Sequence, residues 1–289
     1  DICNFRFTRP KRLGQNRLMT EQAAEGAAPL PPLGASEPLM FEQPLSERMR
    51  AYLRIDFLYN QAVYHANSKS QWGSRAAIGS MLDILAIITR ADTRADVLKE
   101  LERQIGLLTE FQRRPGVDVE RLQTLVANLQ RLRTELLGAG SAYLQPLRDS
   151  PFLAAVRHRS TIPGGTCDFD LPDFFYWLSQ SSEVRERTLS EWLALLRPLC
   201  DAIAELLWLT RQGGRARAET AVNGVFHVTF ERNNPVQLLR VAIDPSLGIY
   251  PEISGSHYRA SVRFVSWQGQ NERARQVEGE VSFELVCCG

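Results

Sequence analysis

The sequence predicts an α+β fold, with an N-terminal helical domain that contains a long αα-hairpin and a C-terminal antiparallel β-sheet domain. Apolar residues recur at helical spacing from about residue 46 to 210, and past Gly213 and Gly214 they alternate in twos. With 289 residues, 44% of them hydrophobic and 23% charged, the chain can build one large core or two ordinary ones.

The first two helices are expected over 46–65 and 71–89. Ser46 follows Pro44 and is the expected N-cap, because its hydroxyl can accept a hydrogen bond from the first turn. The apolar face of the first helix comprises Met49, Leu53 and Phe57, with Tyr52, Ile55 and Tyr59 beside them. That of the second comprises Ile78, Met81, Leu82, Leu85 and Ile88.

Two very regular helical segments follow. Apolar side chains repeat on one face of each, namely Val97, Leu101, Ile105, Leu108 and Phe111 in the first and Leu122, Leu125, Leu129, Leu132 and Leu136 in the second. Between them lies the run RPG at 114–116, which must end a helix. The pair is therefore expected to be an αα-hairpin with its apolar seam inside, serving either as the core of a bundle or as a dimer surface.

Shorter elements complete the prediction. Helices are expected at 152–158, from 171 through 177, at 189–196 and at 199–210, and a Pro-Gly-Gly turn at 163–165. Strands are expected where apolar and polar residues alternate, at 226–230, 238–243, 259–264 and 281–285.

The predicted boundaries are a tail at 1–40, a mainly helical domain at 41–212 and a β-strand domain at 213–289. The tail contains five prolines and almost no periodic apolar pattern, so we expect it to be flexible. Because the chain opens with Asp1, and Met19 and Met40 are both plausible starts, part of this tail is expected not to be native.

The apolar runs and the cysteines indicate in which cellular compartment the protein is found. The longest apolar runs fall far short of the roughly 20 residues that cross a bilayer, and no block resembles a secretory signal. Five cysteines form an odd count without framework spacing, which favours a reducing environment. We therefore expect a cytoplasmic protein without membrane insertion.

Motifs of catalysis and cofactor binding are absent from the sequence. Neither GxGxxG nor GxxxxGK occurs, the four histidines are scattered, and there is no CxxC or HExxH, so no metal and no cofactor are expected. One enzymatic alternative would use Cys167 as nucleophile, His158 as base and Asp168 or Asp170 as the orienting acid. The ordinary interpretation makes Cys167 a small side chain beside a turn, and nearness in sequence does not supply the geometry of a triad.

Arginine is the residue type that suggests binding. Arg50 and Arg54 lie one helical turn apart, Arg157 and Arg159 flank His158, and Arg259 and Arg263 point to the same side of a predicted strand. Each taken singly fits an ordinary surface ion pair or a solvated face. Together they suggest a groove for an acidic or carboxylate-bearing peptide, because guanidinium groups hold carboxylates with two parallel hydrogen bonds.

Several runs of the sequence match one known protein family. The first is FEQPLSERMRAYLRIDFL at 41–58. The interior adds LKELERQ at 98–104, PGVD at 115–118, VRHRSTIPGGTCDFDLP at 156–172 and WL at 177–178. The C-terminal part adds LLR at 238–240, YPEISG at 250–255, Arg259, RF at 263–264 and FELVCC at 283–288. These runs keep their order across 41–288, and together they resemble the ZapD family of bacterial cell division proteins, which bind FtsZ.

The resemblance implies a non-enzymatic homodimer in the cytoplasm at the division site, which binds the C-terminal tail of FtsZ and bundles FtsZ filaments into a stable Z-ring. Its implied binding residues line a groove between the two domains and are Arg50, Arg54, Arg157, Arg159, Arg240, Tyr250, Arg259 and Arg263. The first 40 residues have no counterpart in the family.

The alternative function is a module that binds nucleic acid or another anionic peptide without FtsZ specificity. Outside the tail, however, basic and acidic residues are equal in number, whereas dedicated nucleic-acid binders usually carry a clear basic excess. We therefore expect no nucleic acid among the partners.

Overall fold

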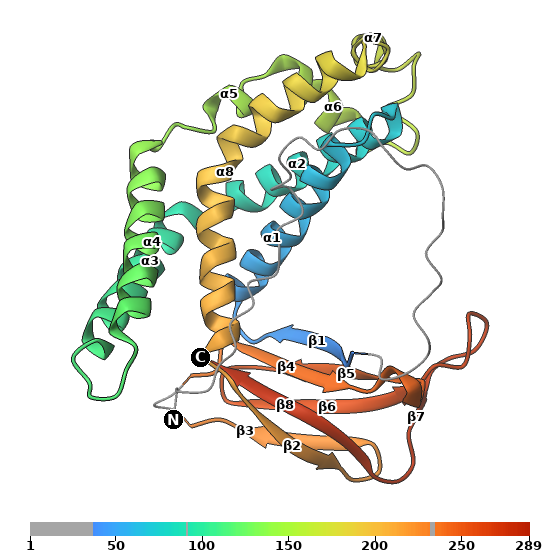
Figure 1. Ribbon diagram of the computed structural model, residues 1–289. Coiled ribbons are helices and arrows are strands. Elements are labelled where there is room, and N and C mark those ends of the chain that lie inside the picture. The colour runs from blue at the N-terminus through green and yellow to red at the C-terminus, as the bar shows by residue number, and fades with distance from the viewer. Residues whose placement is uncertain (1–36, 91, 232–234) are drawn as a thin grey trace, which may run out of the picture. The chain divides into compact units, whose positions relative to one another are not determined.

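The computed structural model describes residues 37–90, 92–231 and 235–289, and their elements are drawn in Figure 1. They form two compact units, which divide within helix α1 (Glu47–Ala66) and near the end of helix α8 (Ser182–Gln212). The helical unit comprises 54–206, and the sheet unit comprises 37–53 and 207–289. No helix in the described ranges is long and apolar enough to cross a membrane. The predicted tail lies outside the described residues up to residue 36.

The predicted α+β class is confirmed. The helices are α1 (Glu47–Ala66), α2 (Gln71–Arg90), α3 (Thr93–Phe111), α4 (Val119–Gly138), α5 (Gln145–Arg148), α6 (Pro151–Arg159), α7 (Pro172–Leu178) and α8 (Ser182–Gln212). The strands are β1 (Leu39–Pro44), β2 (Arg215–Ala221), β3 (Val225–Thr229), β4 (Leu238–Ile243), β5 (Ile249–Gly255), β6 (Arg259–Ser266), β7 (Arg275–Gln276) and β8 (Val281–Cys288).

Helix α1 begins where the sequence predicts but turns a different face inward. Ser46 accepts a hydrogen bond from the Met49 amide at 3.1 Å, as an N-cap does. Tyr52 and Ile55 are buried beside Met49, whereas Phe57 is 65% exposed. The predicted apolar face was therefore wrong at Phe57, because the buried stripe follows the helical repeat from Met49 through Tyr52 and Ile55 instead.

Helices α3 and α4 form the predicted αα-hairpin. Asp92 caps α3 and Asp118 caps α4. Gly116 has a φ of 80°, a left-handed conformation that glycine adopts without strain, in the segment that joins the two helices. The seam is closed at its base, where Leu101 and Leu129 are fully buried, and only half-buried toward the tip.

Helix α8 is one continuous helix where the sequence predicts two. Pro198 lies inside it, and the predicted break at this residue is wrong. Leu196 and Leu199 are both fully buried, so the same apolar face continues across the proline. Packing on this face outweighs the lost backbone hydrogen bond, and Figure 1 shows the helix bending along its length, as a proline requires.

The sheet unit contains two antiparallel sheets. One has the strand order β1-β4-β8-β2, and the other has the order β3-β6-β5 with β7 on β6. Their inner faces share one core, to which β4 contributes Val241, β6 contributes Phe264 and β8 contributes Leu285. The unit is thus a β-sandwich whose outer-facing residues alternate with these core residues.

Four strands were not predicted, and each has a physical reason. Strand β1, which overlaps the end of the predicted tail, and strand β5 are sheet edges that contain Pro44 and Pro251. Proline is tolerated at an edge but reads in sequence as a break. Strand β2 has few apolar residues, yet Asn223 and Gly224 after it both have positive φ and make the hairpin turn to β3. Strand β7 is only two residues long.

Candidate functional site

The α1 arginines occupy its exposed face. Arg54 is exposed and has no ion-pair partner among the residues that the structure describes. Arg50, one turn earlier, donates from Nε to Glu47 Oε1 at 3.3 Å. The Glu47 side chain is 90% exposed, so this ion pair is worth little and can exchange its partner.

Helix α6 presents Arg157 and Arg159. Two features hold this helix in place. Ser150 caps its start by accepting a hydrogen bond from the Leu153 amide at 3.2 Å, and the Leu153 side chain is buried. Arg157 is exposed and makes no ion pair within the described ranges. Arg159 pairs with Asp170 at 3.3 Å, which ties the helix to the turn that follows.

The acidic residues in the turn after α6 make contacts within the fold. The Cys167 thiol lies 3.5 Å from Asp170 Oδ2, and Arg75 reaches Asp168 at 3.6 Å. His158 is exposed, and no hydrogen bond joins it to Cys167 among the described residues. The thiol, base and acid of the enzymatic alternative are therefore not assembled in this structure.

Strands β5 and β6 bring three predicted residues onto one surface. Ala260, Val262 and Phe264 face the core, so Arg259 and Arg263 face outward. Tyr250 lies opposite Val265, which is on the same side of β6 as Arg263 but is itself buried, so Tyr250 shares this face at its covered end. Arg263 donates from Nε to Glu252 at 3.0 Å, directly across the strand pair. Arg259 is exposed and unpaired in the part of the chain that the structure describes.

Arg240 lies on the other outer face of the sandwich. It points away from the core on β4 and donates from Nε to Glu42 Oε1 at 3.0 Å. Arg211 donates to both oxygens of the same carboxylate, each at 2.8 Å. The three side chains are only 20–29% exposed, so Arg240 is held in a largely buried ion cluster that we call the Glu42 triad.

The structure therefore groups some of the predicted residues and separates others. Tyr250, Arg259 and Arg263 lie together on the outer face of β5 and β6. Arg240 lies across the sandwich core from them. Arg54 and Arg157 belong to the helical unit.

Two exposed aromatic residues on α1 were missed as binding candidates. Phe57 is 65% exposed and Tyr64 is 62% exposed, and both follow Arg54 at helical spacing. An exposed face that carries guanidinium and aromatic groups together is typical of protein interfaces. The spacing of these residues can be read from the sequence. Because Phe57 was assigned to the apolar face of the helix, it was not considered as an exposed binding residue.

Comparisons with known proteins give the family. A family model described as "ZapD: Cell division protein" matches residues 53–263. The cell division protein ZapD of Chromobacterium violaceum is 36% identical over 250 residues, which cover 86% of this chain and 99% of that protein. The protein of the same name from Pectobacterium carotovorum subsp. carotovorum is 38% identical over 258 residues, which cover 88% and 99%. These matches confirm the resemblance, and the chain belongs to the ZapD family of cell division proteins.

Proposed function

We propose that this chain is a non-enzymatic protein that binds the C-terminal tail of FtsZ and, as a homodimer, crosslinks FtsZ filaments at the division site. The observation that carries this proposal is the family match, which spans most of the chain and nearly the whole length of its relatives. The arginines support it because they can bind acidic or carboxylate-bearing peptides.

The arginines differ in how available they are to a partner. Arg54, Arg157 and Arg259 are exposed and have no ion pair within the described residues, so a peptide meets them without competition. Arg50 and Arg263 are in exposed pairs, which contribute at most about 1 kcal/mol and can open. Arg240 is the least available of the predicted set, since the Glu42 triad is largely buried.

Binding of one tail is expected to be weak. Two or three arginines that each contribute about 1 kcal/mol, together with apolar contacts, give an affinity of about micromolar strength. A homodimer has two such sites, and many tails lie along each filament. Crosslinking would therefore rest on avidity, which suits a ring that must rearrange.

Co-sedimentation of FtsZ filaments with the full chain tests this function. The protein should increase the pelleted fraction of intact FtsZ and leave FtsZ without its C-terminal tail unchanged. The effect should fall as ionic strength rises, because the screening length shrinks from about 8 Å at 0.15 M to about 3 Å at 1 M. Bundling of tailless FtsZ, or indifference to salt, would contradict a tail-binding site led by arginines.

Single substitutions test which arginines act. Arg54→Ala, Arg157→Ala and Arg259→Ala should each weaken binding of the FtsZ tail peptide about fivefold, the equivalent of about 1 kcal/mol. Arg187→Ala is the matched control, because Arg187 is exposed and unpaired among the described residues but outside the predicted set. An equal loss in the Arg187 variant would mean that only overall charge matters.

The hairpin of α3 and α4 is the proposed dimer surface. Its seam is closed at Leu129, which is fully buried, but Leu125 nearer the tip is only half-buried. Leu125→Glu should therefore convert the dimer to a folded monomer in analytical ultracentrifugation, whereas Leu129→Glu should unfold the helical unit, as circular dichroism would detect. A Leu125→Glu protein that remains a dimer would exclude this surface.

A further inference from the structure

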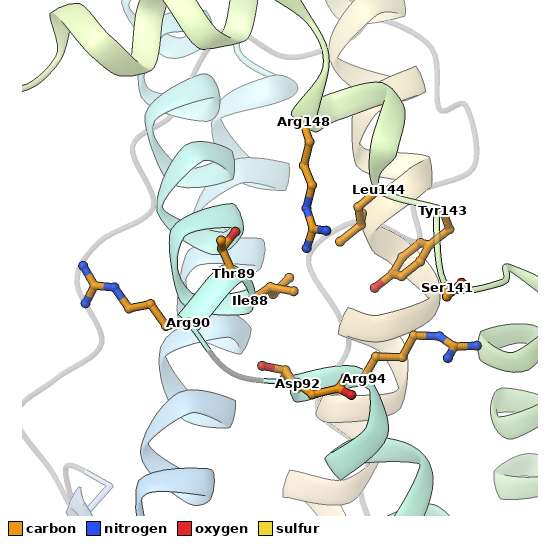
Figure 2. A pocket seen from close by; sticks show the side chains of 10 residues that line it. Ile88, Thr89, Arg90, Asp92, Arg94, Ser141, Tyr143, Leu144 and Arg148 are labelled. Carbon is orange, nitrogen blue, oxygen red and sulfur yellow. The ribbon is translucent and has the colours of Figure 1, made fainter.

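The helical unit contains a cavity that is lined by none of the residues predicted to bind FtsZ. Its volume is about 430 Å³, which lies within the range of small-molecule sites. It lies where α2 ends and α3 begins, and the segment 141–148 closes it from the other side (Figure 2). A cavity of this size admits a small molecule but not a folded partner.

The lining of the cavity carries an excess of positive charge. Arg90, Arg94 and Arg148 contribute to it, and Asp92 is the one acidic residue among the described residues that line it. Asp92 is already engaged, because its carboxylate accepts a hydrogen bond from the Ala95 amide at 3.1 Å and so caps α3. Neither Arg90 nor Arg148 has an ion pair within the described ranges. The partial positive charge at the start of α3 adds to this excess.

Two polar atoms at the cavity are buried without a hydrogen-bond partner among the described residues. They are the hydroxyl oxygen of Tyr143 and Nε of Arg94. The guanidinium of Arg94 is otherwise held in place, since one of its terminal nitrogens donates to the carbonyl of Leu136 at 3.1 Å. Both atoms can donate a hydrogen bond, and a buried donor without a partner costs free energy, so an acceptor that reaches them is favoured.

Two of the lining side chains point into the cavity from one segment. In Figure 2 the guanidinium of Arg148 and the hydroxyl of Tyr143 both point toward the middle of the cavity, whereas the guanidinium groups of Arg90 and Arg94 point away. Burial raises the pKa of Tyr143 to about 12, and the thiol of Cys200 also raises it, while the charges of Arg94 and Arg148 oppose this rise. The two guanidinium groups therefore act on the hydroxyl, which remains a donor at neutral pH.

We propose that this cavity binds the phosphate group of a small molecule, with Arg148 and Tyr143 as its donors. The free polar groups offer hydrogen-bond donors and positive charge, and a phosphate supplies several acceptors and negative charge. The planar fork of Arg148 suits two phosphate oxygens at once.

Isothermal titration calorimetry of the full chain with inorganic pyrophosphate tests the proposal, at constant ionic strength maintained with chloride. We expect saturable binding at one site per chain. Arg148→Gln should weaken it at least tenfold, which equals about 1.4 kcal/mol, and Tyr143→Phe should weaken it about threefold while circular dichroism stays unchanged. Arg187→Gln, which removes an exposed arginine of α8, should bind like the unmodified protein.

The other outcomes would contradict the proposed phosphate site. Absence of saturable heat would overturn the proposal, as would an Arg148→Gln protein that binds pyrophosphate unchanged. An equal loss in Arg187→Gln would show that pyrophosphate responds to overall charge alone. Citrate serves as the carboxylate probe, and citrate binding as tightly as pyrophosphate would overturn the assignment to phosphate.

Discussion

The Glu42 triad provides a direct test of how the sheet unit is held together. Glu42 on β1 accepts three hydrogen bonds, two from Arg211 near the end of α8 and one from Arg240 on β4. Glu42→Gln keeps the size of this side chain but removes its charge. The charge that Glu42 places between the two guanidinium groups is then lost.

The expected cost follows from the burial of these groups. Breaking a fully buried ion pair by removing one partner costs about 3–5 kcal/mol, whereas an exposed pair contributes about 0–1 kcal/mol. The side chains of the triad are 20–29% exposed, which lies nearer the buried case but leaves access for solvent. Glu42→Gln should therefore destabilise the sheet unit by about 2 kcal/mol.

Thermal and urea denaturation measure this effect, with Glu47→Gln as the matched control. Glu47 also pairs with an arginine, but its side chain is 90% exposed, so the same change should cost less than about 0.5 kcal/mol. In a domain of about the size of the sheet unit, a loss of about 2 kcal/mol corresponds to a fall in Tm of roughly 8–16 °C. Equal losses in the two variants would refute the argument that burial makes the triad strong.

Three further changes test other parts of the fold. Arg185 is buried and donates to three backbone carbonyls and the hydroxyl of Ser74, so Arg185→Met should cost more than about 3 kcal/mol in urea denaturation, while exposed Arg187→Met should cost almost nothing. Gly224→Ala should destabilise by more than about 1 kcal/mol, because its φ is +68° and a Cβ would lie 2.4 Å from a carbonyl oxygen, whereas Gly106→Ala in α3 meets open space and should stabilise by about 0.5–1 kcal/mol. Burial raises the pKa of Tyr143 from 10.0 to about 12, so its contribution to stability is complete below pH 10.0 and is lost as the pH rises through about 12; in an ultraviolet titration, Tyr143→Phe should lack the last ionisation step.

The helices could be predicted from the sequence because their buried faces repeat at a fixed period. The two helices of the hairpin show this best, since each carries apolar residues at helical spacing and an aspartate at its start. Pro198 and Phe57 could not be placed in this way. Whether a proline interrupts a helix, or an aromatic residue enters the core, depends on packing against residues distant in the chain.

Whether a strand could be predicted depends on its apolar pattern more than on its position in the sheets. The central strands β4, β6 and β8 alternate in sequence because one side of each faces the core, and all three were predicted, as was the edge strand β3, which also alternates. The edge strands β1 and β5 contain proline and lack this alternation. Consequently the contribution of 39–44 to the sheet unit was missed, and with it the carboxylate of Glu42 that neutralises Arg240.

The arginines show where sequence reasoning about a binding site ends. Their spacing gives the face on which each lies, but not the carboxylate that the fold places beside it. Arg240 and Arg259 look equivalent in sequence, yet one is held by Glu42 and the other is exposed without a partner among the described residues. An acidic peptide that binds Arg240 must first replace an intramolecular carboxylate, whereas binding to Arg259 removes only water. Affinity for an acidic tail should therefore depend more on Arg259 than on Arg240, although the sequence analysis predicts both as binding residues.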